Sequence, residues 1–193
     1  MSARTDDWLP RHKLTIDEYY RMAEVGLLAR DARVELIEGE IINMAPIGSR
    51  HAGTVDQLAN LLKGAVGTQA IVAVQRPLRL GIRSELEPDI LILKPRPDFY
   101  KHSHPIPADV LLLVEVSNSS LRYDRDIKVP LYAKYGVPEI WLIDLGNNHL
   151  HIFCEPKGES YQNSAVSQQL RQMEIERLPN VHIDLSGVLN DIA

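Results

Sequence analysis

Two runs of almost unbroken apolar residues constrain the fold of this chain most. Residues 89–93 (DILIL) and residues 110–116 (VLLLVEV) are rich in Ile, Leu and Val and are too short for typical helices. Such runs are typical of strands that are buried on both faces of a sheet. We therefore predict that these two strands lie at the centre of a sheet that is covered on both sides.

Two amphipathic helices are expected before these strands. Thr15 and Glu18 have the spacing of a capping box and open a helical pattern over residues 19–28. A second helix is expected to be capped by Ser49 and to end near Gly67. Its apolar residues fall on one stripe, which predicts packing against a sheet. They are Val55, Leu58, Ala59, Leu62 and Val66.

The remaining elements alternate with turns rich in Gly, Pro and Asn. A third helix is predicted over residues 121–135, with Pro130 either kinking it or lying near its start. Residues 33–37 and 40–44 flank Glu38-Gly39 and predict a tight hairpin or a bulged turn. Further strands are expected at residues 70–74 running on to 82, 139–145, 149–154 and 160–162, with a final extended segment and a helical turn at 178–185. The pattern predicts an α/β fold in which helices pack against a sheet.

Length and charge limit the class of protein. With 193 residues the chain is expected to form one domain over residues 1–193. The hydrophobic content of 45% and the charged content of 24% are those of a globular protein. The formal net charge of −5 means that any nucleic acid must be held by a local basic patch.

A cytoplasmic location is expected. The single cysteine, Cys154, forms neither an intrachain disulfide nor a multi-cysteine zinc site. The longest wholly apolar run, residues 110–114, is far shorter than the roughly 20 residues of a membrane helix. The first residues contain no apolar core of a signal peptide.

Carboxylates inside apolar strands are the first chemical signal. Asp89 begins one central strand, Glu115 lies near the end of the other, and Glu35 lies in the first hairpin. Charged side chains are rarely buried unless they are paired or bind a metal. If the two strands are neighbours, Asp89 and Glu115 converge at one sheet edge, where their oxygens suit Mg²⁺.

A lysine follows these acids on the predicted third helix. Asp124, Lys128 and Tyr132 are spaced four residues apart and are expected to share one face. A lysine beside metal-binding carboxylates orients a water nucleophile and neutralises the charge that develops on a phosphate. This combination indicates phosphodiester hydrolysis.

An ordered set of segments resembles the Uma family of restriction endonucleases, within the PD-(D/E)XK nuclease superfamily. Pro88-Asp89 followed by Glu115-Val116-Ser117 resembles the superfamily signature. The wider resemblance extends from about Thr15 to the 178–185 tail. Its other segments are residues 35–41, His51, Tyr123-Asp124-Arg125, Lys128, Tyr132-Ala133, residues 136–139, Trp141 and Asp144.

The resemblance implies a restriction-endonuclease-like core, a mixed sheet flanked by helices, in which Asp89 and Glu115 bind Mg²⁺, for which Mn²⁺ can substitute. Glu35 matches an acidic residue that the superfamily often supplies from its first element. The lysine of the signature falls at position 117, where this chain has Ser117. Its role is therefore assigned to Lys128, as in families with a migrated lysine. The catalytic set is Glu35, Asp89, Glu115 and Lys128.

Structural alternatives stay open for each residue. Asp89 could cap a turn, Glu115 could pair with Arg122 or Arg125, and Glu35 could be an exposed strand residue. Lys128 could be solvated or paired with Asp124. For His51 a solvated or capping role is favoured over contact with a phosphate or metal. No Gly-rich phosphate loop is found, so no nucleotide cofactor is expected.

The expected function is a Mg²⁺-dependent endodeoxyribonuclease. Two clusters of basic residues favour weak binding of DNA over a small footprint, which a homodimer would double. The clusters are Arg76, Arg79 and Arg83, and Arg122, Arg125, Lys128 and Lys134. The alternative is a non-catalytic module that keeps the nuclease-like fold and binds nucleic acid or protein, which Ser117 and the acidic net charge favour.

Overall fold

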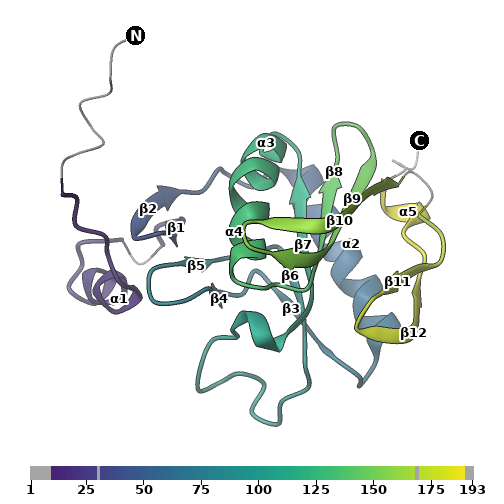
Figure 1. The fold of residues 1–193 in the computed structure, drawn as a ribbon, viewed down its shortest axis with the longest axis horizontal. Coiled ribbons are helices and arrows are strands. Elements are labelled where there is room, and N and C mark those ends of the chain that lie inside the picture. The colour runs from purple at the N-terminus through teal and green to yellow at the C-terminus, as the bar shows by residue number, and fades with distance from the viewer. Residues whose placement is uncertain (1–9, 30, 168–169, 190–193) are drawn as a thin grey trace.

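The computed structural model describes residues 10–29, 31–167 and 170–189, and its main element is a six-stranded mixed sheet (Figure 1). The strand order is β10-β9-β8-β7-β6-β3. The bounds are β3 Ile71–Val74, β6 Ile90–Leu93, β7 Val110–Ser117, β8 Glu139–Asp144, β9 His149–Lys157 and β10 Ser160–Ser167. Strands β7 and β8 are parallel, whereas the other neighbours are antiparallel. The mixed α/β fold predicted from the sequence is confirmed.

The two apolar runs are the central strands β6 and β7, as predicted. Every residue of both strands is buried. They pair antiparallel, with Ile90 opposite Val114. This register brings the start of β6 beside the end of β7, so Asp89 and Glu115 lie at the same edge of the sheet.

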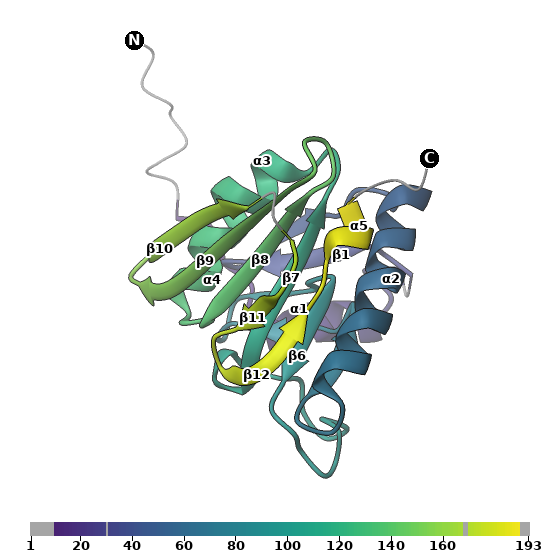
Figure 2. The ribbon, with the colours of Figure 1, turned by 90° about the vertical axis from the view of Figure 1, so that its right-hand side faces the viewer.

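Helices cover both faces of this sheet (Figure 2). Helix α2 (Ser49–Val66) lies on one face, and its buried stripe contains all five apolar residues predicted from the sequence. Helix α4 (Val129–Lys134) lies on the other face with α3 (Leu121–Tyr123). Leu58 and Tyr132, one from each layer, have no exposed surface. Burial of such side chains contributes about 1.5–3 kcal/mol each and fixes the layers.

A second, four-stranded sheet has the order β2-β1-β5-β4. Its strands are β1 Val34–Ile37, β2 Glu40–Asn43, β4 Leu78–Arg79 and β5 Glu85–Leu86. Glu38 and Gly39 connect β1 to β2, and their φ angles are 48° and 80°. Two consecutive positive φ angles are those of the tight hairpin turn predicted for this pair. The turn places Glu35 on β1 opposite Ile42.

Three sequence-based boundaries are wrong. The strand expected from residue 70 to 82 is divided, because β3 joins the large sheet and β4 joins the small one. The cap of α2 is Gly48 and not Ser49, which is the first helical residue. Helix α1 (Ile16–Glu24) keeps the predicted Thr15 capping box but ends before residue 28.

The helix predicted over residues 121–135 is three consecutive segments. A π-helical stretch, η2 (Asp124–Lys128), separates α3 from α4. Pro130 lies in the first turn of α4, directly after the π-helical stretch. The wider π turn rotates the side chains that follow it. Asp124 and Lys128 therefore have different partners, described below.

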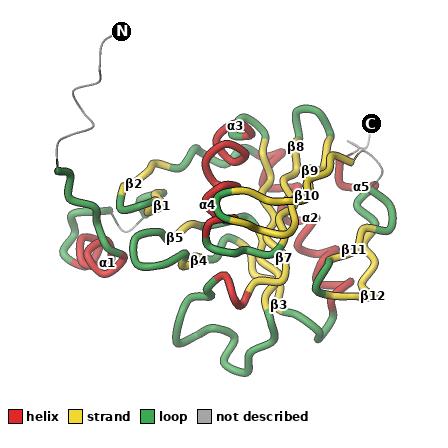
Figure 3. The backbone as a smooth tube through the Cα atoms, in the orientation of Figure 1, coloured by secondary structure: helices red, strands yellow, loops and turns green. Residues whose placement is uncertain are grey.

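The rest of the chain closes the α2 face. Strands β11 (Met173–Ile175) and β12 (Leu178–Ile183) form a short hairpin, and helix α5 (Ser186–Leu189) follows. The predicted strand at residues 160–162 is longer, because β10 continues to Ser167. A long irregular loop joins β6 to β7, interrupted by the 3-10 helix η1 (Pro107–Asp109) (Figure 3). Within the described residues, no helix has the length and apolar character needed to cross a membrane.

Candidate active site

A pocket of about 500 Å³ opens beside the ends of the two central strands. The walls come from β1, the start of α2, the turn before β6, the end of β7 and η2. Glu35, Asp89, Glu115 and Lys128, the four residues predicted as catalytic, all line this pocket. The structure therefore brings the whole predicted set together.

Asp89 is held rigidly at the pocket wall. Its Oδ2 accepts a hydrogen bond from the backbone N–H of Val116 at 2.8 Å. The same oxygen lies 3.1 Å from His51 Nε2, on the first turn of α2. The carboxylate accepts, so this nitrogen carries the proton. The turn-capping role considered for Asp89 is replaced by a cross-link between β6, β7 and α2.

Lys128 bridges the other two acids. Its Nζ lies 3.1 Å from Glu35 Oε1 and 3.2 Å from Glu115 Oε1. All three side chains are less than a tenth exposed. Tyr132 also donates its hydroxyl to Glu115 Oε1, at 2.7 Å. Lys128 is therefore neither solvated nor paired with Asp124.

Burial and charge oppose each other in this group. Burial raises the pKa of Glu115 to about 8, although Lys128 acts to lower it. Burial lowers the pKa of Lys128, but the charges of Glu115 and Glu35 outweigh burial and raise it above its ordinary value. The lysine is therefore cationic at neutral pH, whereas the raised pKa of Glu115 means that a second positive charge is needed to favour its carboxylate form.

The remaining ion-pair alternatives are wrong. Arg122 and Arg125 pair with Asp126 at the surface and do not pair with Glu115. Asp124 accepts hydrogen bonds from Ser117 Oγ and Ser120 Oγ, both at 2.6 Å. Ser117, at the position of the signature lysine, is therefore used to hold the start of η2.

Two further residues that line this acidic pocket, His51 and Glu87, were not predicted from the sequence as site residues. The sequence favours a solvated or capping role for His51. In the structure it pairs with Asp89 instead, and this hydrogen bond is the main cause that raises the pKa of His51. Glu87 lines the pocket too, and burial raises the pKa of its carboxyl. Its backbone N–H donates to Glu35 Oε1 at 2.9 Å. Two features of the sequence could have indicated these residues. His51 is the third residue of α2, and Glu87 lies two residues before Asp89.

The donor set fits a hard divalent cation. Within the described part of the chain, protein hydrogen bonds reach Asp89 through Oδ2 only and Glu115 through Oε1 only. The second oxygen of each carboxylate is left for a cation. The pocket wall also carries five carboxylates but only two Lys or Arg side chains, so its charge favours a cation. The carboxylates are Glu35, Glu87, Asp89, Glu115 and Asp124, and the basic residues are Arg33 and Lys128.

A helix-flanked mixed sheet with a lysine and clustered carboxylates at one edge defines an α/β protein with a nuclease-like fold. The chain belongs to the Uma2 family, whose description is "Putative restriction endonuclease" and whose model matches residues 16–186. This finding confirms the resemblance recognised in the sequence.

A solved structure supports the same fold. It is described as the crystal structure of "a putative nuclease belonging to DUF820 from Anabaena variabilis". The two chains are 16% identical and superpose with a TM-score of 0.69, over 91% of this chain and 97% of the other. No curated protein matches the chain.

Proposed function

We propose that this protein is a metal-dependent endonuclease that hydrolyses phosphodiester bonds of DNA. The observation that carries the proposal is the burial of Lys128 between Glu35 and Glu115 at the wall of a pocket that also contains Asp89. Burying a charge costs several kcal/mol, and pairing repays this cost only in part, so a buried cluster of this kind is expensive as a purely structural feature. Membership of the Uma2 family supports the same reading.

Each residue has a distinct role in this proposal. Asp89 and Glu115 would hold Mg²⁺, or Mn²⁺ in its place, which would supply activation of water and stabilisation of the charge on the phosphate. Lys128 places a fixed positive charge beside Glu115, where it orients the attacking water or stabilises the phosphate oxygens. Glu35 orients Lys128 and assists at the metal. His51 holds Asp89 in place through its hydrogen bond.

The partner in this proposal is DNA, bound weakly through exposed basic residues near the pocket. Arg122 is one of them, since its side chain is 93% exposed and lies next to the pocket residues Tyr123 and Asp124. We further propose that residues 1–193 act as one domain and that a homodimer doubles the contact with DNA.

A cleavage assay tests the function. The full chain is incubated with plasmid DNA and with single-stranded DNA, in Mg²⁺ and in EDTA. Lys128→Ala is compared with Lys134→Ala, whose lysine pairs with Glu38 at the surface. We expect cleavage in Mg²⁺ only, with a rate roughly a hundredfold or more lower for Lys128→Ala because a positioned charge is lost. Equal rates for the two variants would contradict the role of Lys128.

The competing function is a non-catalytic binding module with the same fold. The specific observation that favours it is Ser117 at the position of the signature lysine, where its hydroxyl donates to Asp124. In that case the chain binds DNA or a protein but cleaves no DNA in Mg²⁺ or Mn²⁺. Measuring binding and cleavage on the same DNA separates the two functions.

A further inference from the structure

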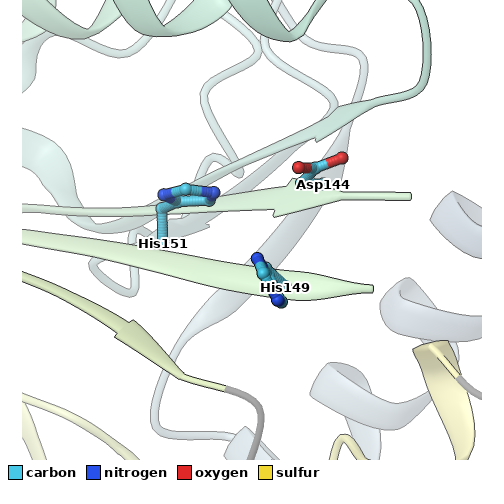
Figure 4. A group of neighbouring side chains, drawn as sticks. All are labelled: Asp144, His149 and His151. Atoms are coloured by element: carbon cyan, nitrogen blue, oxygen red, sulfur yellow. The ribbon is translucent and has the colours of Figure 1, made fainter. Parts of the chain in front are cut away.

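A second group of metal-binding side chains lies at the hairpin between β8 and β9, outside the acidic pocket. One ligand atom each from Asp144, His149 and His151 lies within 4.8 Å of the others (Figure 4). Asp144 is the last residue of β8, and both histidines are on β9. The group contains two imidazoles, whereas the acidic pocket offers mainly carboxylates.

The strand register explains why the three side chains meet. Asp144 is directly opposite His149, and Leu142 is opposite His151. Residues two apart on a strand point to the same face, so the two histidines lie together on the face that carries Asp144. Leu142 belongs to the apolar cluster under α4, which identifies this face as the one that α4 covers.

His151 has a ring nitrogen that the protein does not use. Its Nε2 is buried and has no hydrogen-bond partner among the residues that the structure describes. A buried polar atom of this kind is rare and requires an explanation.

Asp144 is already fixed in one orientation. Its Oδ1 accepts the backbone N–H groups of Gly146 at 2.9 Å and Asn147 at 3.1 Å. Its Oδ2 accepts one further bond, from Asn147 Nδ2 at 2.7 Å. Such bonds hold the carboxylate in place, as outer-shell hydrogen bonds do around metal ligands, and Oδ2 keeps a lone pair free.

We propose that Asp144, His149 and His151 bind a divalent cation of the Zn²⁺ class, which ties β8 to β9. Two imidazoles and one carboxylate are a ligand set of this class, with a fourth position left for water. Tetrahedral ligands at about 2.0–2.1 Å from zinc are about 3.3 Å apart, so side-chain rotation must bring the three groups slightly closer. The oxygen-rich pocket at Asp89 and Glu115 instead favours Mg²⁺.

Titration with Co²⁺ tests this site directly, because tetrahedral Co²⁺ absorbs visible light much more strongly than the hydrated ion. The full chain is titrated with Co²⁺, and Zn²⁺ is then added to displace it. We expect an intense visible band, its loss on addition of Zn²⁺, and a rise in melting temperature with Zn²⁺. His149→Ala and His151→Ala should each lower the Co²⁺ affinity by at least about tenfold, because each removes a ligand.

Three control variants test whether Co²⁺ binds at Asp144, His149 and His151 or elsewhere on the protein. His182→Ala removes an exposed histidine that pairs with Glu174 and should keep the visible band. Cys154→Ser tests the other group of possible ligands, Glu139, Cys154 and Glu176 at the opposite end of the β8–β9 pair, and should keep the band as well. The double variant Asp89→Asn and Glu115→Gln removes the acidic-pocket ligands and should also keep the band, whether or not the protein is a nuclease.

Two outcomes would overturn this site. One is an absence of the intense band and of Zn²⁺ stabilisation in the unmodified chain. The other is a band and an affinity that are unchanged in both His149→Ala and His151→Ala. Asp144→Ala is not used, because loss of its hydrogen bonds to Gly146 and Asn147 would disturb the turn itself.

Discussion

The Lys128 ammonium lies 3.2 Å from Glu115 Oε1, and both side chains are almost fully buried. The carboxylate comes from the end of β7, and the lysine comes from the π-helical segment that follows this strand. Because both charges are removed from water, each depends on the other for its stability. This pair is therefore important for folding as well as for the proposed reaction.

Loss of the lysine should destabilise the fold. Lys128→Met leaves Glu35 and Glu115 buried without their cation, and we expect the free energy of unfolding to fall by about 3–5 kcal/mol. Lys134→Met is the matched control on α4, where the exposed lysine pairs with Glu38, and it should change stability little. Urea denaturation measures both. Equal stability of the two variants would show that the buried pair is not coupled to folding.

His51 should tune metal binding without touching the metal. Its Nε2 is 3.1 Å from Asp89 Oδ2, so it orients the carboxylate. We expect His51→Ala to weaken Mn²⁺ binding by about 10–100-fold, as is typical when an outer-shell partner is removed. Isothermal titration calorimetry gives the affinity, and His12→Ala, at an exposed site beside Glu18, is the control. Unchanged Mn²⁺ affinity in His51→Ala would contradict this role.

The stability of the protein should depend on pH through Glu139. Burial raises the pKa of this carboxyl from 4.5 to about 7. As pH rises, the carboxyl of Glu139 therefore loses its proton in the unfolded chain before it does so in the folded chain. The contribution of Glu139 to the free energy of unfolding is complete below pH 4.5 and is lost as pH rises toward 7. The loss amounts to about 3 kcal/mol.

Glu139→Gln isolates this effect. The variant cannot ionise, so its unfolding free energy should rise relative to that of the unmodified chain as pH increases through this window. Any constant difference between the two proteins reflects the loss of one acceptor oxygen, because the Trp141 Nε1–H and the Glu176 N–H each donate to a different oxygen of Glu139. Parallel stability curves from denaturation at several pH values would rule out the raised pKa.

Binding to DNA should respond moderately to salt. Because the net charge of the chain is −5 and the proposed contact uses only a few basic residues, we expect a slope that corresponds to a few phosphates. Arg122→Ala should reduce this slope by about 1. Lys63→Ala, in the last turn of α2, should leave the slope unchanged. Fluorescence anisotropy in graded salt measures the slope, and an affinity independent of salt would indicate another kind of ligand.

The sequence predicted the central part of this site because two physical signals coincided. Asp89 and Glu115 interrupt apolar strands, and antiparallel pairing of those strands brings the two acids to one edge. Periodicity did not predict the π turn, since an insertion within a helix leaves a nearly normal apolar pattern. The four-residue spacing nevertheless placed Asp124 and Lys128 in one pocket, where they have different hydrogen-bond partners.

His51 and the hairpin histidines were harder to predict. Histidine occurs in capping, solvated and ligating positions, so its role depends on which groups face it in the fold. Asp89 faces His51 only because α2 packs with its first turn beside the end of β7. His149 and His151 meet Asp144 only through the β8–β9 register.

The cleavage rate of Glu115→Gln in Mg²⁺ tests the nuclease proposal most directly. This variant keeps an acceptor for the Tyr132 hydroxyl but removes the charge that faces the cation. Glu139→Gln is the matched control, since Glu139 is also a buried glutamate of the large sheet but does not line the pocket. We expect the unmodified chain and Glu139→Gln to cut plasmid DNA in Mg²⁺ and Glu115→Gln to cut none. Full cleavage by folded Glu115→Gln, or cleavage by the unmodified chain in EDTA, would contradict the proposal.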